Sequence, residues 1–268
     1  GQLPKLTLME TGATDTDTPR NPDGLFLRWD GREVQWALMF RDLDSQESEF
    51  SFGQREVSKI SMLPEVVRAL KGRFSAVNEV VYAQRFARTT IVPAIVLKDD
   101  SEAAEKWFKL HHAPTKDVGL RILHLESIEG EPVFVEGLDG DWEESVMRSF
   151  PQAQGIIQSA VLMETAISIS RQTDLWVVVI DSGKRGADFA ASFKGNAIWS
   201  GHSLKGDPES ILYSVVNAMH RNGVEQEGVA IRFSGAIGQD LNEVFKRFFS
   251  DIECLGQSKW EGLKLLSK

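Results

Sequence analysis

One stretch, residues 175–204, constrains the fold more than any other part of the sequence. It contains three short runs of strand-forming residues: Leu175–Ile180, Ala187–Phe193 and Ala197–Ser200. Two turn-forming triplets separate these runs: Asp181-Ser182-Gly183 and Lys194-Gly195-Asn196. This spacing predicts consecutive antiparallel strands. The first run is apolar from Trp176 to Ile180, so we expect it in the middle of a sheet that is covered on both faces.

The same order of elements occurs earlier in the chain. Residues 24–53 hold three strand candidates, followed by a helical pattern at 60–70 and a strand candidate at 77–82. Residues 174–203 hold three strands, followed by a helix from Asp207-Pro208 to about Arg221 and a strand at 229–233. The order β-β-β-α-β therefore occurs twice, as expected for tandem copies. A chance succession of common elements would give the same pattern, and the sequence leaves both explanations open.

The remaining segments predict further strands and helices. We expect short strands at 89–93, 119–125 and 132–135, and helices at 101–110, 139–150, 156–169 and 239–249. Four acidic residues stand at the start of the second of these helices: Asp139, Asp141, Glu143 and Glu144. Because carboxylates favour helix N-termini, we interpret them as a solvated charge cluster.

Composition describes an ordinary acidic globular protein. The chain has 268 residues, of which 42% are hydrophobic and 26% charged, with a formal net charge of −9. This charge argues against nucleic acid or an anionic membrane as the main partner, because neither attracts an acidic protein. The single cysteine, Cys254, allows no internal disulfide and is consistent with the cytoplasm. No run of about 18 apolar residues predicts a membrane-spanning helix.

The repeated order of elements resembles the actin-like ATPase superfamily, which includes sugar kinases, heat-shock chaperones, actin and pilus-assembly proteins. In that superfamily an Asp-x-Gly turn in each half approaches phosphate, and a Gly-rich turn in the second half approaches the adenosine. Residues 179–183 resemble the second phosphate turn, and residues 233–238 resemble the adenosine turn. The resemblance therefore implies nucleotide-binding residues at Asp181, Ser182, Gly183, Lys184, Arg185, Gly235, Ala236 and Gly238.

More narrowly, residues 25–255 resemble an uncharacterised Bacteroidetes family of unknown function that is grouped with the actin-like ATPases. The segments that match are Thr90-Ile91-Val92-Pro93, the acidic stretch 136–144, Ser149-Phe150-Pro151 and residues 207–213. The resemblance implies an α/β fold of two ribonuclease H-like halves. Each half is expected to contain a mixed sheet with a three-strand antiparallel meander and flanking helices. It implies no particular reaction.

Both phosphate turns depart from the superfamily pattern. In the first half the turn is Asp30-Gly31 between the bulky residues Trp29 and Arg32, and small hydroxyl residues are absent. In the second half Lys184 and Arg185 stand where small residues usually follow. Bulky side chains hinder the close backbone approach that phosphate binding requires. The triplet 181–183 also suits a simple hairpin turn, so the residues alone leave its role open.

These observations lead to one leading hypothesis and one alternative. We expect a mobile arm at 1–23, a first actin-like half at 24–150 and a second at 151–268. The leading hypothesis is a cytoplasmic, non-catalytic binding or assembly component with a degenerate nucleotide cleft and no metal or cofactor. The alternative is an ATP-dependent phosphotransferase or ATPase that uses ATP and Mg²⁺ in the cleft. Expected partners are an unknown protein and a second copy of the chain, because strands at 25–40 leave a sheet edge exposed.

Overall fold

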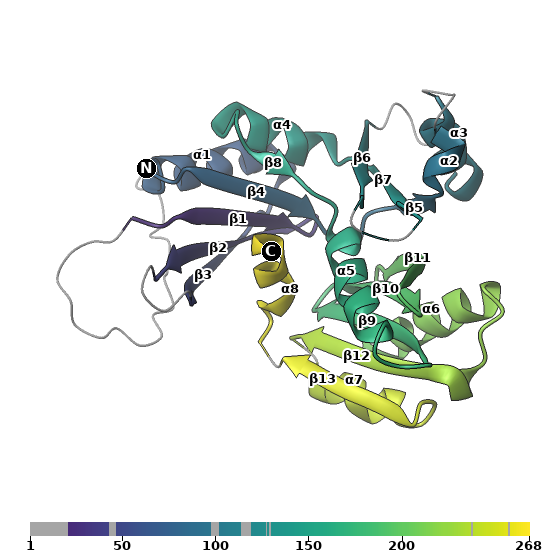
Figure 1. Cartoon of the computed structure of the whole chain (residues 1–268). Helices are drawn as coiled ribbons and strands as arrows, with labels where there is room; N and C mark the ends of the chain where they lie inside the picture. The colour runs from purple at the N-terminus through teal and green to yellow at the C-terminus, as the bar shows by residue number, and fades with distance from the viewer. Residues whose placement is uncertain are drawn as a thin grey trace.

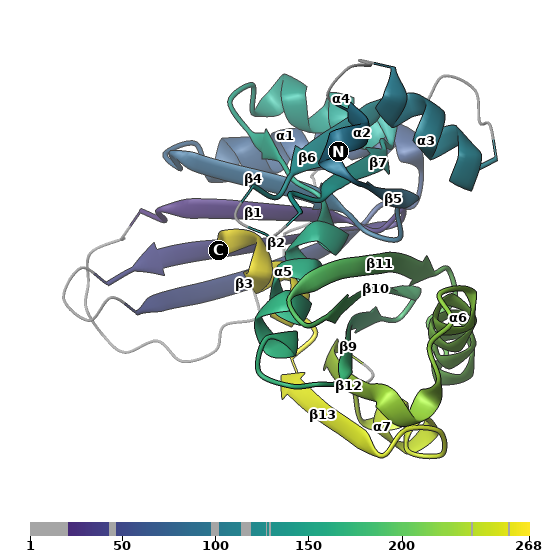
Figure 2. The same cartoon turned by 45° about the vertical axis from the view of Figure 1, so that its right-hand side comes forward.

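A computed structural model describes residues 21–42, 47–97, 102–113, 119–126, 128, 130–236, 238–256 and 258–268. The described residues form two lobes, each built on a five-stranded mixed sheet, and a smaller three-stranded sheet beside them (Figure 1). Figure 2 shows the two large sheets as separate layers joined near helix α5. This arrangement confirms the predicted α/β class with one mixed sheet in each half. The predicted arm at 1–23 lies mostly outside the described residues.

The first sheet has the strand order β3-β2-β1-β4-β8. Its strands are β1 (Gly24–Trp29), β2 (Glu33–Arg41), β3 (Ser48–Glu56), β4 (Glu79–Gln84) and β8 (Gln154–Gly155). β1 to β3 form the antiparallel meander, while β4 and β8 run parallel to β1. β1 and β2 are therefore interior strands, and the expectation of an exposed edge at 25–40 was wrong. The local pattern could not show that β3 and β4 cover both sides of this pair.

The second sheet repeats this order and these strand directions as β11-β10-β9-β12-β13. Its strands are β9 (Trp176–Gly183), β10 (Gly186–Phe193), β11 (Asn196–Ser203), β12 (Val229–Gly235) and β13 (Asp251–Gly256). β9 lies in the middle, antiparallel to β10 and parallel to β12. The meander predicted from residues 175–204 is confirmed. Descent of the two halves from one duplicated unit remains a prediction.

Helices cover both faces of the second sheet, as the apolar first strand of the meander requires. Alternate residues of β9 enter different cores: Val178 and Ile180 pack against α6 and α7, whereas Val177 and Val179 pack against α5. The helices are α5 (Gln158–Ser170), α6 (Pro208–Arg221) and α7 (Gly238–Phe245), and the 3-10 turn η2 (Gln226–Gly228) precedes β12. Asp207 caps α6 as predicted, since its Oδ1 accepts the Ser210 backbone N–H at 2.9 Å.

One face of the first sheet is covered by α1 (Leu63–Arg73), which follows the 3-10 turn η1 (Ile60–Met62), and by α4 (Gly140–Ser149). The other face is covered by the C-terminal segment of the chain, which contains α8 (Glu261–Lys264) and η3 (Leu265–Ser267). Leu263 and Leu266 pack there on Phe26, and Trp260 stacks on Phe52 at 5.2 Å. The chain thus returns from the second lobe to the first. The boundary at residue 150 remains a prediction.

A third sheet, with the order β5-β7-β6, lies beside the first lobe, with β5 near β11 of the second lobe (Figure 2). It consists of β5 (Thr89–Val92), β6 (Leu120–His124) and β7 (Val133–Gly137), with α2 (Ala94–Leu97) and α3 (Ala103–His111) beside it. The three strands were predicted, but their assembly into a separate sheet was not. β5 lies next to β11 of the second lobe, and the hydroxyl groups of Thr89 and Ser200 are 3.0 Å apart.

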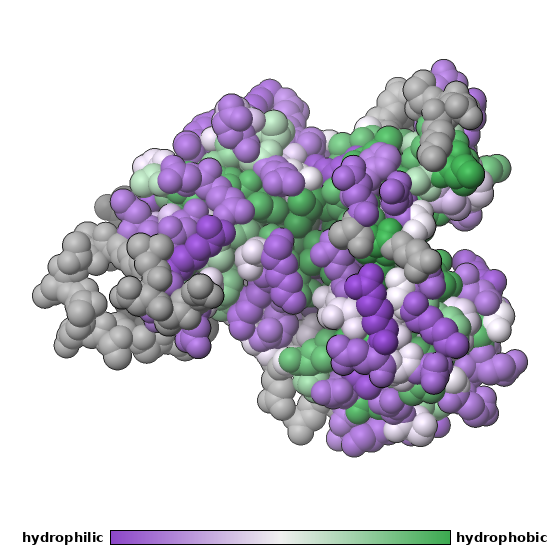
Figure 3. Space-filling model, viewed as in Figure 1, coloured by the Kyte–Doolittle hydropathy of each residue, from purple (hydrophilic) through white to green (hydrophobic). Residues whose placement is uncertain are grey.

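The helices of this third unit carry the most exposed of the large apolar side chains that the structure describes. Ile95 on α2 is 74% exposed and Leu110 on α3 is 78% exposed. Figure 3 shows hydrophobic, green side chains over these two helices. No helix in the described ranges is long and apolar enough to cross a membrane.

Candidate functional site

Two hairpin turns face each other between the lobes, at the carboxyl ends of the central strands β1 and β9. In the first, the side chain of Asp30 shapes the turn, since its Oδ1 accepts the backbone N–H groups of Arg32 at 3.0 Å and Glu33 at 2.7 Å. In the second, Lys184 and Arg185 connect β9 to β10. The guanidinium of Arg185 donates to Asp30 Oδ2, so the two turns are linked by an ion pair.

The residues predicted as the second turn, 181–183, lie within β9 instead. They pair with Asp188, Ala187 and Gly186 of β10, and Asp181 and Ser182 also pair with β12. The prediction of a turn at these positions was therefore wrong, and the turn is formed by the next two residues, Lys184 and Arg185. The physical reason is burial: strand pairing on both sides of Asp181 and Ser182 satisfies backbone groups that a turn would leave unpaired.

Asp181 is the centre of a buried charge network. Its Oδ2 accepts hydrogen bonds from Arg28 Nη1 at 2.7 Å and from Arg85 Nη2 at 3.1 Å, and the side chains of Arg28 and Asp181 are 0% exposed. Arg85 Nη2 also donates to the backbone oxygen of Asp181 at 2.9 Å. Gln35 Oε1 accepts hydrogen bonds from the other two nitrogens of Arg28, Nε at 3.1 Å and Nη2 at 2.9 Å. Buried charges of this kind persist only where their partners are in place.

A second carboxylate extends the network toward β10. Arg85 Nε donates to Asp188 Oδ2 at 3.1 Å, and the backbone N–H of Phe86 donates to Asp188 Oδ1 at 2.8 Å. Three arginines and three aspartates thus meet between the lobes: Arg28, Arg85, Arg185, Asp30, Asp181 and Asp188. Their formal charges balance, so this set carries no excess positive charge for an incoming phosphate.

Burial shapes the electrostatics of this network. Desolvation and the neighbouring charge of Arg85 lower the pKa of Arg28 to about 10, against the attraction of Asp181, so the group stays charged at neutral pH. Desolvation also acts to lower the pKa of Arg85, but the two aspartates outweigh it and the pKa is raised. Desolvation raises the pKa of Asp188 against the attraction of Arg85. We therefore expect the Arg85–Asp188 pair to weaken as the pH falls.

The structure brings seven of the eight predicted nucleotide-binding residues together. Asp181 lies in the network just described, and Ser182, Gly183, Lys184, Arg185 and Ala236 line one cavity with Asp30, Arg85 and Lys259. Gly235 lies beneath Ser182 with a φ of 111°, and a Cβ there would lie 2.7 Å from Ser182 Oγ. Gly238 begins α7. Nucleotide binding by these residues remains a prediction.

The cavity between the turns is very small. Its volume is about 40 Å³, whereas pockets for drug-sized ligands measure roughly 300–1,000 Å³. Arg28 and Asp188 belong to the buried network beside it, and Arg85 lines it; the sequence analysis missed all three. One signal for the first was present, because Arg28 interrupts the apolar run 25–29 and a buried cation needs an anion nearby. Nothing local to residues 85 and 188 indicated that they would meet.

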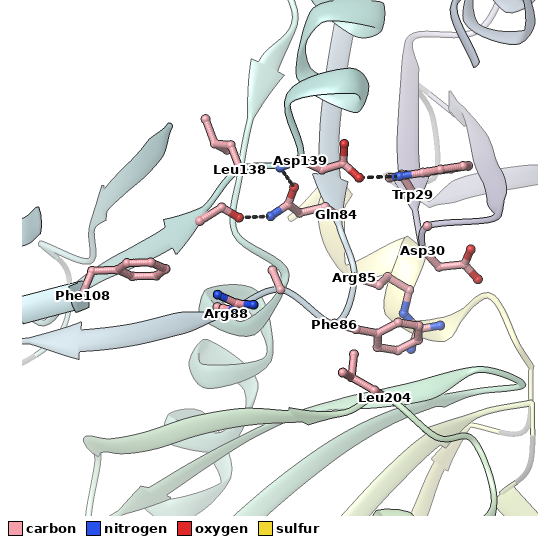
Figure 4. Close-up of a pocket in the computed structure, with 13 residues that line it drawn as sticks. Trp29, Asp30, Gln84, Arg85, Phe86, Arg88, Phe108, Leu138, Asp139 and Leu204 are labelled. Carbon is pink, nitrogen blue, oxygen red and sulfur yellow. Dashed lines mark hydrogen bonds between the residues drawn. The ribbon is translucent and has the colours of Figure 1, made fainter. Parts of the chain in front are cut away.

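A larger cleft of about 470 Å³ opens on the other side of Arg85, between β1, the third sheet and Leu204 of the second lobe (Figure 4). Its polar wall is held by internal hydrogen bonds. Gln84 donates to the Gly137 oxygen at 2.5 Å and accepts the Asp139 backbone N–H at 2.8 Å, while Trp29 Nε1 donates to Asp139 Oδ2 at 3.0 Å. Phe86, Phe108 and Leu138 supply apolar surface. The cleft can accept a partly apolar group, but its wall offers few unused polar atoms.

The acidic cluster at the start of α4 is not wholly solvated, as the sequence analysis expected. Asp139 caps the helix, and Glu143 reaches back to the first sheet, where it accepts from Tyr82 Oη at 2.5 Å and from Arg121 Nη2 at 2.6 Å. Arg121 is shared with the buried Glu136 at 3.3 Å. One guanidinium therefore serves two carboxylates and ties the third sheet to the first lobe. Glu143 faces inward because it lies on the side of the helix that carries the buried Trp142 and Val146.

This shared arginine leads to a pH-dependent stability. Desolvation, together with the nearby charges of Asp188 and Glu143, raises the pKa of Glu136 from 4.5 to about 8, against the attraction of Arg121. The native state therefore binds this proton more tightly than the unfolded chain does. The resulting stabilisation is complete below pH 4.5 and is lost as the pH rises through about 8.

We expect Glu136→Gln to flatten the fall in the free energy of unfolding over this pH interval. Urea denaturation at a series of pH values measures the slope. The matched control is Glu144→Gln, which removes a carboxylate paired with Arg148 on the surface of α4 and should leave the slope as it is. An unchanged slope in Glu136→Gln would show that Glu136 is already ionised at neutral pH.

In sequence, the chain matches no described protein family and no curated protein. In structure, it is similar to a Bacteroides thetaiotaomicron protein with an actin-like ATPase fold and unknown function. The two chains share 16% sequence identity and align with a TM-score of 0.73 over 90% of this chain and 94% of the other. It is also similar to a chain of the PilM-PilN type IV pilus biogenesis complex, with 13% identity, a TM-score of 0.56 and coverage of 91% and 90%. Ethanolamine utilization protein EutJ from Carboxydothermus hydrogenoformans aligns at 9% identity and a TM-score of 0.49, over 94% and 91%. The first two likenesses confirm the predicted fold, and the chain has the actin-like ATPase fold.

Proposed function

We propose that this protein is a non-catalytic binding or assembly component whose nucleotide cleft is closed by its own side chains. The observation that carries the proposal is the state of Asp181, the carboxylate expected to approach phosphate. It is fully buried against Arg28 and Arg85, and the cavity beside it measures about 40 Å³. Phosphoryl transfer needs carboxylates and a metal aimed at the phosphates, and here the carboxylate is already engaged.

The structural likeness to a chain of a pilus biogenesis complex supports a role in protein assembly. An actin-like fold in that complex works together with another protein, and the exposed Ile95 and Leu110 offer this chain a surface for a protein partner. The lone Cys254 supports a cytoplasmic setting. We propose no role for nucleic acid, because the formal net charge is −9.

The alternative is an ATP-dependent phosphotransferase or ATPase. The fold favours it. Two aspartates also favour it, because Asp30 lies in the first turn and Asp181 lies shortly before the second. For Mg-ATP to enter, the ion pair between Arg185 and Asp30 would have to break and the lobes would have to separate. The two functions therefore differ in one measurable property, which is turnover of Mg-ATP.

We expect no release of phosphate above background when the purified chain is incubated with millimolar Mg-ATP. The matched variant is Arg185→Ala, which alters the second turn but leaves the buried pairs of Asp181 in place. Turnover near 1 s⁻¹, within the usual range of enzymes, and abolished in Arg185→Ala would establish the alternative. A faster rate in Arg185→Ala than in the wild-type chain would point to a suppressed ATPase.

We also propose that the chain self-associates, through α2 and α3 rather than through a sheet edge at 25–40. Light scattering at about 100 µM, far above most specific dissociation constants, should report a mass above that of the monomer. Leu110→Lys combined with Ile95→Lys should return the monomer, because each places a charge on the exposed apolar surface. Leu255→Lys, on β13, is the control and should not change the mass. A monomeric wild-type chain would contradict the proposal.

A further inference from the structure

We propose that three arginines form an internal clamp that holds the two lobes closed without any ligand: Arg28, Arg85 and Arg185. The inference rests on the proposed function, and it adds that the cleft is closed in the resting protein and does not respond to nucleotide. The clamp predicts a fixed distance between the lobes. This distance is measured separately from phosphate release, so the clamp and the proposed function can fail independently.

Every ion pair of the clamp joins the two lobes. Arg28 on β1 reaches Asp181 on β9, and Arg85, which follows β4, reaches both Asp181 and Asp188. Arg185 makes the reverse connection, from the second lobe to Asp30 of the first. Because the clamp has arginines on both sides, a rotation of either lobe would stretch several pairs together.

The backbone around the clamp is shaped to fit it. Phe86 has a φ of 54°, a conformation that residues with a side chain rarely adopt, and its backbone N–H is used by Asp188. The ring of Phe86 lies on Gly186, where a Cβ would be 2.9 Å from the ring atom Cε1. A Cβ at Gly183 would lie 2.6 Å from Arg85 Nη1. The second lobe therefore has glycine at two positions where Phe86 and Arg85 of the first lobe come close.

A second contact between the lobes, away from the arginines, supports the clamp. β5 of the third sheet lies against the edge strand β11, where the hydroxyl groups of Thr89 and Ser200 are 3.0 Å apart. His112 Nε2 and the backbone oxygen of Thr89 are 2.9 Å apart and hydrogen-bonded, which holds β5 in position. Opening would therefore break polar contacts at two separate places between the lobes and part Arg28 and Arg85 from their carboxylates.

The clamp can be tested by measuring the distance across the mouth of the cleft in the full chain. Spin labels are placed on Ile122 of β6 and Tyr213 of α6, which are 45% and 72% exposed, after Cys254→Ser has removed the native thiol. Pulsed electron–electron double resonance then gives the distribution of distances between the two labels. We expect one narrow distribution in the wild-type background, unchanged by Mg-ATP. A shift to a shorter or longer distance with Mg-ATP would overturn the clamp even if no phosphate were released.

The charge of the clamp is tested with Arg85→Met, which keeps most of the aliphatic stem and removes the guanidinium. We expect a longer mean distance and a broader distribution. Arg41→Met removes a surface pair with Glu79 and should leave the distribution unchanged. If Arg85→Met does not fold, Arg185→Met provides the test, because its pair with Asp30 is partly exposed and less critical for folding. A folded clamp variant with the wild-type distribution would overturn the proposal.

Discussion

Replacement of Asp181 by alanine should lower the free energy of unfolding by about 3–5 kcal/mol, the range for removing one partner of a buried ion pair. The loss is expected at the upper end, because the variant leaves two guanidinium groups, those of Arg28 and Arg85, facing a site with one carboxylate fewer. Arg28 keeps only the neutral oxygen of Gln35 as a hydrogen-bond acceptor. Urea denaturation followed by tryptophan fluorescence measures the change.

A surface pair provides the control for this prediction. Glu79→Ala removes the carboxylate that pairs with Arg41 at 3.2 Å, and the two side chains are 46% and 55% exposed. Its effect should be about 0–1 kcal/mol, because water and salt screen such pairs. If Asp181→Ala were as mild as Glu79→Ala, Asp181 would not be the centre of a buried network.

The size of this effect changes how a nucleotide assay must be read. In an active actin-like enzyme, loss of activity in an Asp181→Ala variant would assign the residue to the chemistry. In this chain the same loss would follow from destabilisation, because Asp181 joins β9 to β1 through Arg28. Arg185→Ala, which alters a partly exposed pair, therefore separates catalysis from folding better.

The sequence was sufficient to predict those elements whose cause is local. Residues 176–180 are apolar on both faces, and β9 is central and covered by helices on both sides. Lys194 and Gly195 suit a tight turn, and both have positive φ, 49° and 81°. Asp207 and Pro208 predict the start of a helix through their own backbone preferences, and α6 begins there. In each case the residues that determine the structure are neighbours in the chain.

The site depended on contacts between residues far apart in the chain, and these were not predictable. Asp181 and Gly183 suit a turn by propensity. Asp181 lies in β9 because it pairs with two strands and forms an ion pair with Arg28, 153 positions away, and Gly183 extends the strand by pairing with β10. Glu143 of α4 was expected in solvent, yet its carboxylate is hydrogen-bonded by Arg121 of β6 and Tyr82 of β4. Charged residues in apolar segments, such as Arg28, are the signal that such pairs exist, although they do not identify the partner.

The second large effect is expected at Gly262 in α8, where the C-terminal segment lies against Asp181. A Cβ at this position would be 2.6 Å from Asp181 Oδ1 and closer still to Oδ2. The carboxylate cannot move away without losing Arg28 at 2.7 Å and Arg85 at 3.1 Å. Gly262→Ala should therefore destabilise the protein by about 1–3 kcal/mol, the usual cost of overpacking.

Two comparisons make this prediction specific. Gly72→Ala, on α1, is the control: a Cβ there meets nothing within 4 Å, so alanine should stabilise the helix by up to about 1 kcal/mol. In the Asp181→Ala background the space next to Gly262 is empty, so a second change, Gly262→Ala, should cost much less than it does alone. The two losses would then not add, and the coupling energy would measure the contact directly. Additive losses would show that the C-terminal segment does not press on Asp181, and that the return of the chain to the first lobe contributes nothing to the charge network.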